Sequence, residues 1–346
     1  MRPPMSALAL FEAIDPRELH AAVAQLLERR LDAIDAIRAE DAPGGCRGYA
    51  APKQFARIDW RAGTLQGSCR IVAKAFPEGR GEAACYRALG RHAILPRVVA
   101  CRDRRDGTEI LLLERLDQVG LDPTDGQELS DLLRSLAVFN AIVPQAALPQ
   151  VDLEQWCQQT LAILPALLAE CRQGFHGRDC AAEANAWPRS RVPLAAACAE
   201  AAKRAAICPQ GVVHLDPAPQ NCGRRSTASD IVLFDLQTLR SGPVVADAAC
   251  WCEPVACGAV QAADRLRQWC SALVAVGGPF LQPDQAREWA DAVQPLRIGS
   301  VLGWFHGRLH DGMADFTDDR DAAREAFRGW VCEMLRICRR CLWGGL

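Results

Sequence analysis

The sequence lacks the features that mark membrane, nucleic-acid-binding and repeat proteins. No apolar run reaches the about 18 residues that a membrane-spanning helix needs. The 40 Lys and Arg residues nearly balance the 42 Asp and Glu residues, so bulk charge does not favour a polyanionic partner. No segment repeats, and there is no low-complexity tail. We therefore expect neither a membrane nor a nucleic acid among its partners.

We also expect no secretory signal, because Glu12 and Asp15 interrupt the short apolar run near the start. Cysteine is abundant, but its 17 copies are odd in number and scattered, which does not resemble a disulfide framework. We expect a cytoplasmic protein with reduced thiols.

The spacing of cysteine and histidine gives little support to a zinc site. Cys338 and Cys341 form the one CxxC pair, whereas structural zinc sites use two such pairs. His306 and His310 share a helix face in HGRLH, but the glutamate of an HExxH motif is missing. We interpret the thiols as small apolar residues and the two histidines as ordinary helix residues.

The chain is long enough for two lobes, since its 346 residues are 50% hydrophobic and 24% charged, as in soluble globular proteins. The first third favours strands. Its expected elements are a leading amphipathic helix over 15–41, strands over 54–60 and 69–76 with a turn over 63–67, a short helix over 79–92, and a hairpin of 97–102 with 109–114.

After Leu116 the periodicity becomes mainly helical. Helices are expected over 129–142, 153–173, 194–207 and from 262 onward, with short strand-and-loop units at 211–221 and 230–237. The sequence predicts an α+β fold of two lobes: a small β-rich lobe over 1–116 and a larger, mainly helical lobe over 117–346.

One short stretch carries most of the chemistry. In HLDPAPQN, His214, Asp216 and Asn221 follow an apolar strand, and Asp235 ends the next apolar run. A hairpin would bring Asp216, Asn221 and Asp235 to one edge. Phosphoryl transfer needs a carboxylate at the attacking hydroxyl and oxygen ligands for Mg²⁺. Taken alone, Asp and Asn beside proline also suit a simple capped turn.

The longer segment HLDPAPQN…IVLFDLQTLRSGPVVADAA resembles the catalytic segment of the aminoglycoside phosphotransferase and choline kinase-like family, a phosphotransferase enzyme family with a protein-kinase-like fold. That family combines H-x-D-x-x-x-x-N with a strand ending in Asp-x-(Gln/Glu), then Gly-Pro and a further aspartate. The matching residues after Asn221 are Asp235, Gln237, Gly242, Pro243 and Asp247.

The resemblance implies a role for each matched residue. Asp216 would orient and deprotonate the acceptor hydroxyl, and Asn221 with Asp235 would bind magnesium. Asp247 would anchor the catalytic loop by hydrogen bonding, and His214 would pack within it as a structural residue.

The resemblance also places the nucleotide in the small lobe. Lys74 lies in the apolar run RIVAKAF, where a charge is costly without a partner. It resembles the strand lysine that binds the α- and β-phosphates, although an edge-strand lysine reaching solvent is the alternative. Its expected partner is Glu82, with Glu78 as the alternative.

Two further nucleotide contacts are assigned by position. The backbone from Glu114 to Leu116 would meet adenine as the hinge after the last small-lobe strand. The glycines Gly44, Gly45 and Gly48 would cover the phosphates, with the turn at Gly67–Ser68 as the alternative.

The acceptor pocket is expected in the segment 303–321. Trp304, Asp311 and Asp315 combine aromatic and acidic side chains, which suit an amine. A solvated loop with helix caps is the other interpretation of these aspartates.

The resulting hypothesis is a small-molecule kinase that uses ATP, with GTP as the alternative, and Mg²⁺. Its acceptor would be an aminoglycoside, amino sugar, sugar or amino alcohol. A catalytically silent nucleotide-binding module is the alternative function. A protein kinase is disfavoured, because DLQ stands where Asp-Phe-Gly would be and no Ala-Pro-Glu segment follows.

Overall fold

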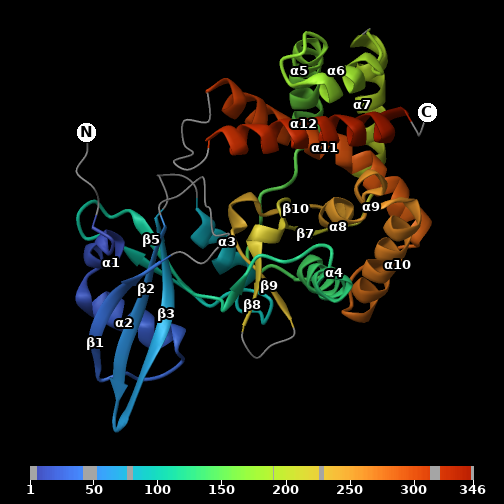
Figure 1. The fold of residues 1–346 in the computed structure, drawn as a ribbon. Coiled ribbons are helices and arrows are strands. Elements are labelled where there is room, and N and C mark those ends of the chain that lie inside the picture. Colours follow the sequence, from blue (N-terminus) through green and yellow to red (C-terminus); the bar gives the residue numbers. More distant parts are fainter. Residues whose placement is uncertain are drawn as a thin grey trace. The chain divides into compact units, whose positions relative to one another are not determined.

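The structure is a computed structural model that describes residues 6–41, 53–75, 81–189, 191–225, 230–311 and 320–343. The chain forms two compact units (Figure 1). The sheet unit comprises Met1–Ser135, Val143–Leu148 and Asp216–Leu239, and the helical unit comprises Leu136–Ile142, Pro149–Leu215 and Arg240–Leu346. The segment Asp216–Leu239 therefore belongs to the sheet unit, although Pro149–Leu215, which comes directly before it in the sequence, belongs to the helical unit.

The sheet unit is built on an antiparallel five-stranded sheet of order β1-β2-β3-β5-β4. Its strands are β1 (Ala33–Glu40), β2 (Lys53–Ala62), β3 (Leu65–Ala75), β4 (Val98–Arg102) and β5 (Glu109–Glu114). Helices α1 (Ala9–Ala13) and α2 (Pro16–Leu26) lie against one face of this sheet (Figure 1). Phe11 and Val23 from the helices join Ile58 and Ile71 from the strands in one buried cluster, which holds the two layers together.

The expected helix over 15–41 is wrong in its second half. It begins as predicted, since the Asp15 carboxylate accepts the Arg17 N–H at 2.9 Å. It ends at Leu26, because Glu28 adopts φ 51° and the Arg29 N–H donates to the Ala24 carbonyl at 3.0 Å. Residues Ala33–Glu40 pair with β2 instead, and this sheet pairing overrides their helix-favouring composition.

The β2–β3 hairpin turns at Gly63, whose φ of +61° favours glycine. Gly67 and Ser68 do not lie in the turn but inside β3, and this corrects their expected position. A Cβ at Gly67 would come within 2.5 Å of the Trp60 ring, so the glycine there makes room for the cross-strand tryptophan.

A second, three-stranded sheet of order β6-β8-β9 completes the sheet unit, together with α3 (Glu82–Leu89). Its strands are β6 (Gln118–Val119), β8 (Cys222–Arg224) and β9 (Ile231–Leu233). The short turns η1 (Pro219–Asn221) and η2 (Leu236–Thr238) flank the β8–β9 hairpin. The sequence predicted a hairpin between the strand before His214 and the run that ends at Asp235. This pairing is wrong: β7 (Gln210–Val213) pairs with β10 (Arg240–Pro243), whereas β8 is the strand that pairs with β9.

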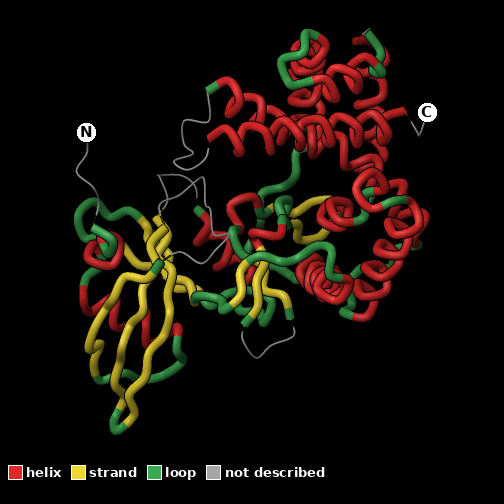
Figure 2. The backbone as a smooth tube through the Cα atoms, viewed as in Figure 1, coloured by secondary structure: helices red, strands yellow, loops and turns green. Residues whose placement is uncertain are grey.

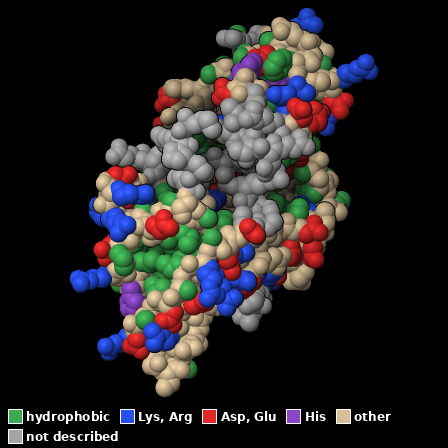
Figure 3. Space-filling model, turned by 60° about the vertical axis from the view of Figure 1, so that its left-hand side comes forward, with side chains coloured by type: hydrophobic (Ala, Val, Ile, Leu, Met, Phe, Trp, Pro, Cys, Tyr) green, Lys and Arg blue, Asp and Glu red, His purple; other side chains and the backbone are tan. Residues whose placement is uncertain are grey.

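The sheet unit also carries an apolar groove of about 610 Å³. Leu8 and Phe11 line it from the side of α1, Leu19 from α2, and Ile34 and Ile37 from β1. Figure 3 shows hydrophobic side chains gathered on this unit, between clusters of charged ones.

The helical unit begins with the end of α4 (Gly126–Asn140). Its further elements are α5 (Leu153–Arg172), α6 (Arg178–Asn185), α7 (Arg191–Ala206), β7 (Gln210–Val213), β10 (Arg240–Pro243), α8 (Val245–Trp251), α9 (Pro254–Cys257), α10 (Ala259–Ala275), α11 (Pro283–His310) and α12 (Arg320–Trp343). Figure 2 shows helices joined by short loops, with the β7–β10 pair among them. The long α11 contacts α5, α7, α8 and α12 and so forms the centre of the unit.

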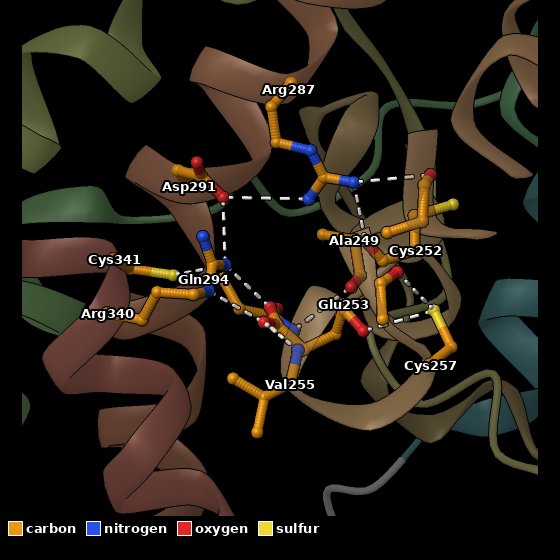
Figure 4. Close-up of polar contacts among 12 residues, drawn as sticks. Ala249, Cys252, Glu253, Val255, Cys257, Arg287, Asp291, Gln294, Arg340 and Cys341 are labelled. Carbon is orange, nitrogen blue, oxygen red and sulfur yellow. Dashed lines mark hydrogen bonds and ion pairs between the residues drawn. The ribbon is translucent and has the colours of Figure 1, made fainter. Parts of the chain in front are cut away.

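A buried ion-pair network joins α9, α11 and α12 (Figure 4). The Arg340 guanidinium makes two hydrogen bonds of 2.9 Å to Glu253 and one of 3.0 Å to Asp291. Glu253 is only 2% exposed, so these paired hydrogen bonds compensate a carboxylate that would otherwise be costly to bury.

The sixteen cysteines in the described segments are all free thiols. Burial raises the pKa of most of them, to about 11 for Cys208 and about 12 for Cys252, and this favours the neutral thiol. Among the helices that the structure describes, none is both long enough and apolar enough to cross a membrane.

Candidate active site

A buried charge cluster lies in the sheet unit, where β3 and α3, which are close in sequence, meet the distant segment after β9. The Lys74 ammonium of β3 is 2.5 Å from the Glu82 carboxylate of α3 and 2.5 Å from the Asp235 carboxylate after β9. Lys74 is 4% exposed and Glu82 1%. The partner required for a buried lysine is therefore present. Among these three groups, negative charge exceeds positive charge by one.

Glu82 also ties the β9 hairpin to α3. Its second carboxylate oxygen accepts the Leu236 N–H at 3.1 Å. The alternative partner, Glu78, lies outside the described residues. Asp235 adopts a left-handed conformation, φ 65° and ψ 57°, which is costly for a residue other than glycine and is commonly found at functional sites.

Tyr86 is a further member of this cluster that the role assignments omitted. It lies one turn after Glu82 on α3 and is buried. Burial, together with the negative charges of Glu82 and Asp235, raises the pKa of its phenol well above the ordinary value. The signal in the sequence was its i+4 spacing from Glu82, which places both side chains on one helix face.

Asp216 and Asn221 meet at the start of the β8–β9 hairpin. The Asn221 side-chain N–H donates to the Asp216 carboxylate at 2.9 Å and to the Asp216 carbonyl at 3.0 Å. Asp216 is exposed, whereas Asn221 is 6% exposed. The Phe234 N–H donates to the Asn221 carbonyl at 3.0 Å, which joins the loop to the residue before Asp235.

The donor set at this edge suits a hard cation. The Asn221 side-chain amide nitrogen is engaged by Asp216, so its Oδ1 is the atom it can offer to a metal. The Asp235 carboxylate supplies oxygen of the same kind, and Mg²⁺ prefers such ligands. The surplus negative charge of the Lys74 cluster also favours a positively charged ligand.

In the helical unit, Asp247 fixes the residues that immediately precede Asp216. Its carboxylate accepts the backbone N–H groups of His214 and Leu215, both at 2.8 Å. Asp247 is fully buried, and Leu215 is held at φ 67°. The fully buried His214 ring packs against Phe139, with ring centroids 5.7 Å apart.

Asn140 is a supporting residue that the sequence interpretation passed over. Its side-chain N–H group donates to Asp247 at 2.9 Å and to the Val212 carbonyl at 2.8 Å. Its side-chain oxygen accepts the Trp269 indole N–H at 3.3 Å. Asn140 therefore helps to hold the loop anchor Asp247 in place.

Replacing the anchor Asp247 by alanine is expected to lower the free energy of unfolding by about 3 kcal/mol or more. Two buried backbone N–H groups and the Asn140 amide would lose their charged acceptor, and each unsatisfied buried donor costs about 1–3 kcal/mol. Urea unfolding would measure the loss. The matched control is Asp264→Ala, because that carboxylate is 55% exposed and pairs with Arg267, so a change within about 0.5 kcal/mol is expected. An unchanged unfolding midpoint for Asp247→Ala would contradict the anchoring role.

The segment expected to meet adenine is tightly held. The Glu114 N–H donates to the Arg97 carbonyl and the Arg115 N–H donates to the Arg70 carbonyl, so both amides already form hydrogen bonds within the sheet unit. Burial by itself would raise the pKa of the Glu114 carboxyl, but hydrogen bonds from Arg225 and the Arg97 N–H outweigh it and lower that pKa. Leu116 is 5% exposed.

The remaining predicted residues are only partly placed. Gly44, Gly45, Gly48 and Asp315 lie outside the described residues. Trp304 is on α11 with 43% exposure, and Asp311 is exposed just after that helix. The Arg308 guanidinium lies 5.5 Å from the centre of the Trp304 ring, so this ring already makes a cation–π contact within the protein.

Comparison with known proteins relates the chain to phosphoryl-transfer enzymes. Residues 48–289 match the family model described as the phosphotransferase enzyme family. No curated protein matches the chain significantly by sequence.

Several solved structures share its fold at low sequence identity. An aminoglycoside phosphotransferase from Alicyclobacillus acidocaldarius is 16% identical, with a TM-score of 0.50, covering 91% of this chain and 94% of its own. A choline kinase from Streptococcus pneumoniae is 13% identical, with a TM-score of 0.51 and coverage of 88% and 95%. A Plasmodium vivax ethanolamine kinase is 14% identical, with a TM-score of 0.51 and coverage of 96% and 89%. The predicted two-lobed, kinase-like α+β fold is thereby confirmed.

Proposed function

Because the chain belongs to the phosphotransferase enzyme family, we propose that it is an ATP- and Mg²⁺-dependent small-molecule kinase. It would transfer the γ-phosphate to a hydroxyl of an aminoglycoside, amino sugar, sugar or amino alcohol. The observation that carries this proposal is the buried contact of Lys74 with both Glu82 and Asp235, in the same unit as the Asp216–Asn221 pair.

The lysine cluster has the properties of a phosphate-binding group. Two carboxylates hold the Lys74 ammonium in place, so a bound phosphate would meet a charge that is already oriented. Glu82 would position the lysine, and Asp235 would share its carboxylate between the lysine and a cation. Bound Mg²⁺ would neutralise charge on the phosphates, with Asn221 and Asp235 as its protein ligands.

Asp216 would be the catalytic residue. Its exposed carboxylate is oriented by the Asn221 amide at 2.9 Å, which suits a group that must meet an acceptor from solution. In the reaction it would align the acceptor hydroxyl and take its proton as the new P–O bond forms, while the bond from the γ-phosphorus to the bridging oxygen breaks and ADP leaves. Asp247 would act only by fixing His214 and Leu215 before it.

The nucleotide and the acceptor are assigned by the resemblance and by side-chain chemistry. The Glu114–Leu116 segment would bind adenine, and the glycines Gly44, Gly45 and Gly48 would cover the phosphates. We propose ATP as the nucleotide, with GTP as the alternative. Trp304, Asp311 and Asp315 would favour an amine-bearing acceptor. The free thiols support a reducing, cytoplasmic compartment.

The test is consumption of ATP by the purified protein with Mg²⁺, screened against pooled aminoglycosides, amino sugars, sugars and amino alcohols. We expect one pool to yield a phosphorylated product, and Asp216→Asn to yield it at least about 100-fold more slowly. Nucleotide binding without turnover in any pool would favour the silent binding module. Absence of nucleotide binding would overturn the proposal.

A further inference from the structure

Two histidines and a glutamate converge in the helical unit, and none of the three has a role in the phosphoryl transfer proposed above. His306 and His310 lie one turn apart on α11, and Glu170 lies near the end of α5. The two Nε2 atoms are 3.1 Å apart, and the Glu170 oxygens lie 3.0–3.3 Å from them. Among the described residues, these three form the one such group whose ligand atoms lie within 4.8 Å of one another.

The sequence interpretation set these histidines aside because HGRLH lacks the HExxH glutamate. The fold supplies a carboxylate from another helix, 136 residues from His306. Spacing along α11 could not reveal it, because α5 and α11 meet only in the packed unit.

Hydrogen bonding alone does not explain how close the two Nε2 atoms lie to each other. If both carry protons, each can donate to the Glu170 carboxylate, but the two N–H groups then lie 3.1 Å apart. If one is bare, it can accept the N–H of the other, but its lone pair then also lies 3.0–3.3 Å from the Glu170 oxygens. A cation among the three removes both conflicts, because each neutral imidazole and the carboxylate would then present a lone pair to positive charge.

The spacing fits a tetrahedral metal. Zinc binds histidine nitrogen and carboxylate oxygen at about 2.0–2.1 Å, which makes the ligand–ligand edge of a tetrahedron about 3.3 Å. The observed separations from Glu170 Oε1 to the two Nε2 atoms are 3.0 and 3.2 Å, close to that edge. Imidazole with one carboxylate is a ligand set that zinc favours.

Neighbouring residues orient the ligands. The His176 Nε2 lies 3.2 Å from Glu170 Oε2, and its buried Nδ1 has no hydrogen-bond partner among the described residues, so the tautomer that donates to Glu170 fits best. Phe175 stacks on His310, with ring centroids 5.3 Å apart and planes at 11°. Such partners fix the position of metal ligands.

We propose that Glu170, His306 and His310 form a binding site for Zn²⁺ that clips the end of α5 to α11. The fourth position faces solvent, since the His310 side chain is 44% exposed. The site shares no residue with the Mg²⁺ ligands proposed above, and its nitrogen-rich ligand set distinguishes it chemically from them.

The test is metal binding by the chelator-treated full chain. Isothermal titration with Zn²⁺, and Co²⁺ absorption spectra that distinguish nitrogen and oxygen ligands from thiolate, would be measured for wild type, His310→Gln and the double variant His306→Gln/His310→Gln. We expect the double variant to lose one equivalent of metal and the zinc-dependent rise in Tm. His310→Gln should fold, because its side chain is exposed, and should bind more than tenfold more weakly.

The matched control is His92→Gln, an exposed histidine of the sheet unit that should bind as wild type does. His176→Gln should weaken binding by about 10–100-fold, as expected for a residue that orients a ligand. Equal stoichiometry and affinity in wild type and His310→Gln, or a purely thiolate Co²⁺ spectrum, would overturn the proposal. Neither readout depends on phosphoryl transfer.

Discussion

Asp216→Asn is expected to lower phosphoryl transfer by about 10²–10⁴-fold, the usual contribution of a positioned general base. The amide keeps the size of the side chain but cannot accept the acceptor proton. Binding of Mg·ATP should change little, because the phosphate-binding contacts are assigned to Lys74 and Asp235. Single-turnover kinetics and calorimetric nucleotide titration would measure the two quantities separately.

The control for this variant is Asp230→Asn, an exposed carboxylate immediately before β9 in the same unit. It makes the same chemical change away from the loop, so transfer should stay at the wild-type rate. A rate for Asp216→Asn that matches this control would remove Asp216 from the reaction.

Asp235→Asn is expected to abolish transfer and also to weaken nucleotide binding by about 100-fold, which corresponds to about 2.7 kcal/mol. The Lys74 ammonium would lose one of its two carboxylate partners, and the proposed cation site would lose its charged ligand. Titration of Mg·ATP would detect the loss, which Asp216→Asn should not show. Equal weakening in both variants would contradict this division of roles.

The same variant makes a distinct prediction about stability. Lys74 would remain paired with Glu82 at 2.5 Å, and the surplus negative charge of the cluster would be removed. The Tm of the nucleotide-free protein should therefore stay unchanged or rise, as expected where a site trades stability for function. A Tm several degrees lower would show that Asp235 serves mainly to stabilise the fold.

Much of the local organisation was predictable. The Asp15 cap, the hairpin of β4 and β5, and the loop after β7 all depend on residues within a few positions of one another. The expected helix over 15–41 failed for the opposite reason. The composition of Ala33–Glu40 favours a helix, and its strand exists because β2 offers hydrogen-bonding partners.

The sequence by itself determined which chemical groups the chain carries and in what order, and that order was enough to indicate a family. It also required a partner for Lys74, since a buried ammonium cannot remain unpaired. Only the tertiary structure decided that Asp235, 161 residues away, shares that lysine with Glu82. It likewise decided that Asn140 supports Asp247 and that Glu170 meets two histidines. The physical reason is the same throughout: short-range order follows from neighbours along the chain, whereas contacts between distant segments depend on how whole helices and strands pack.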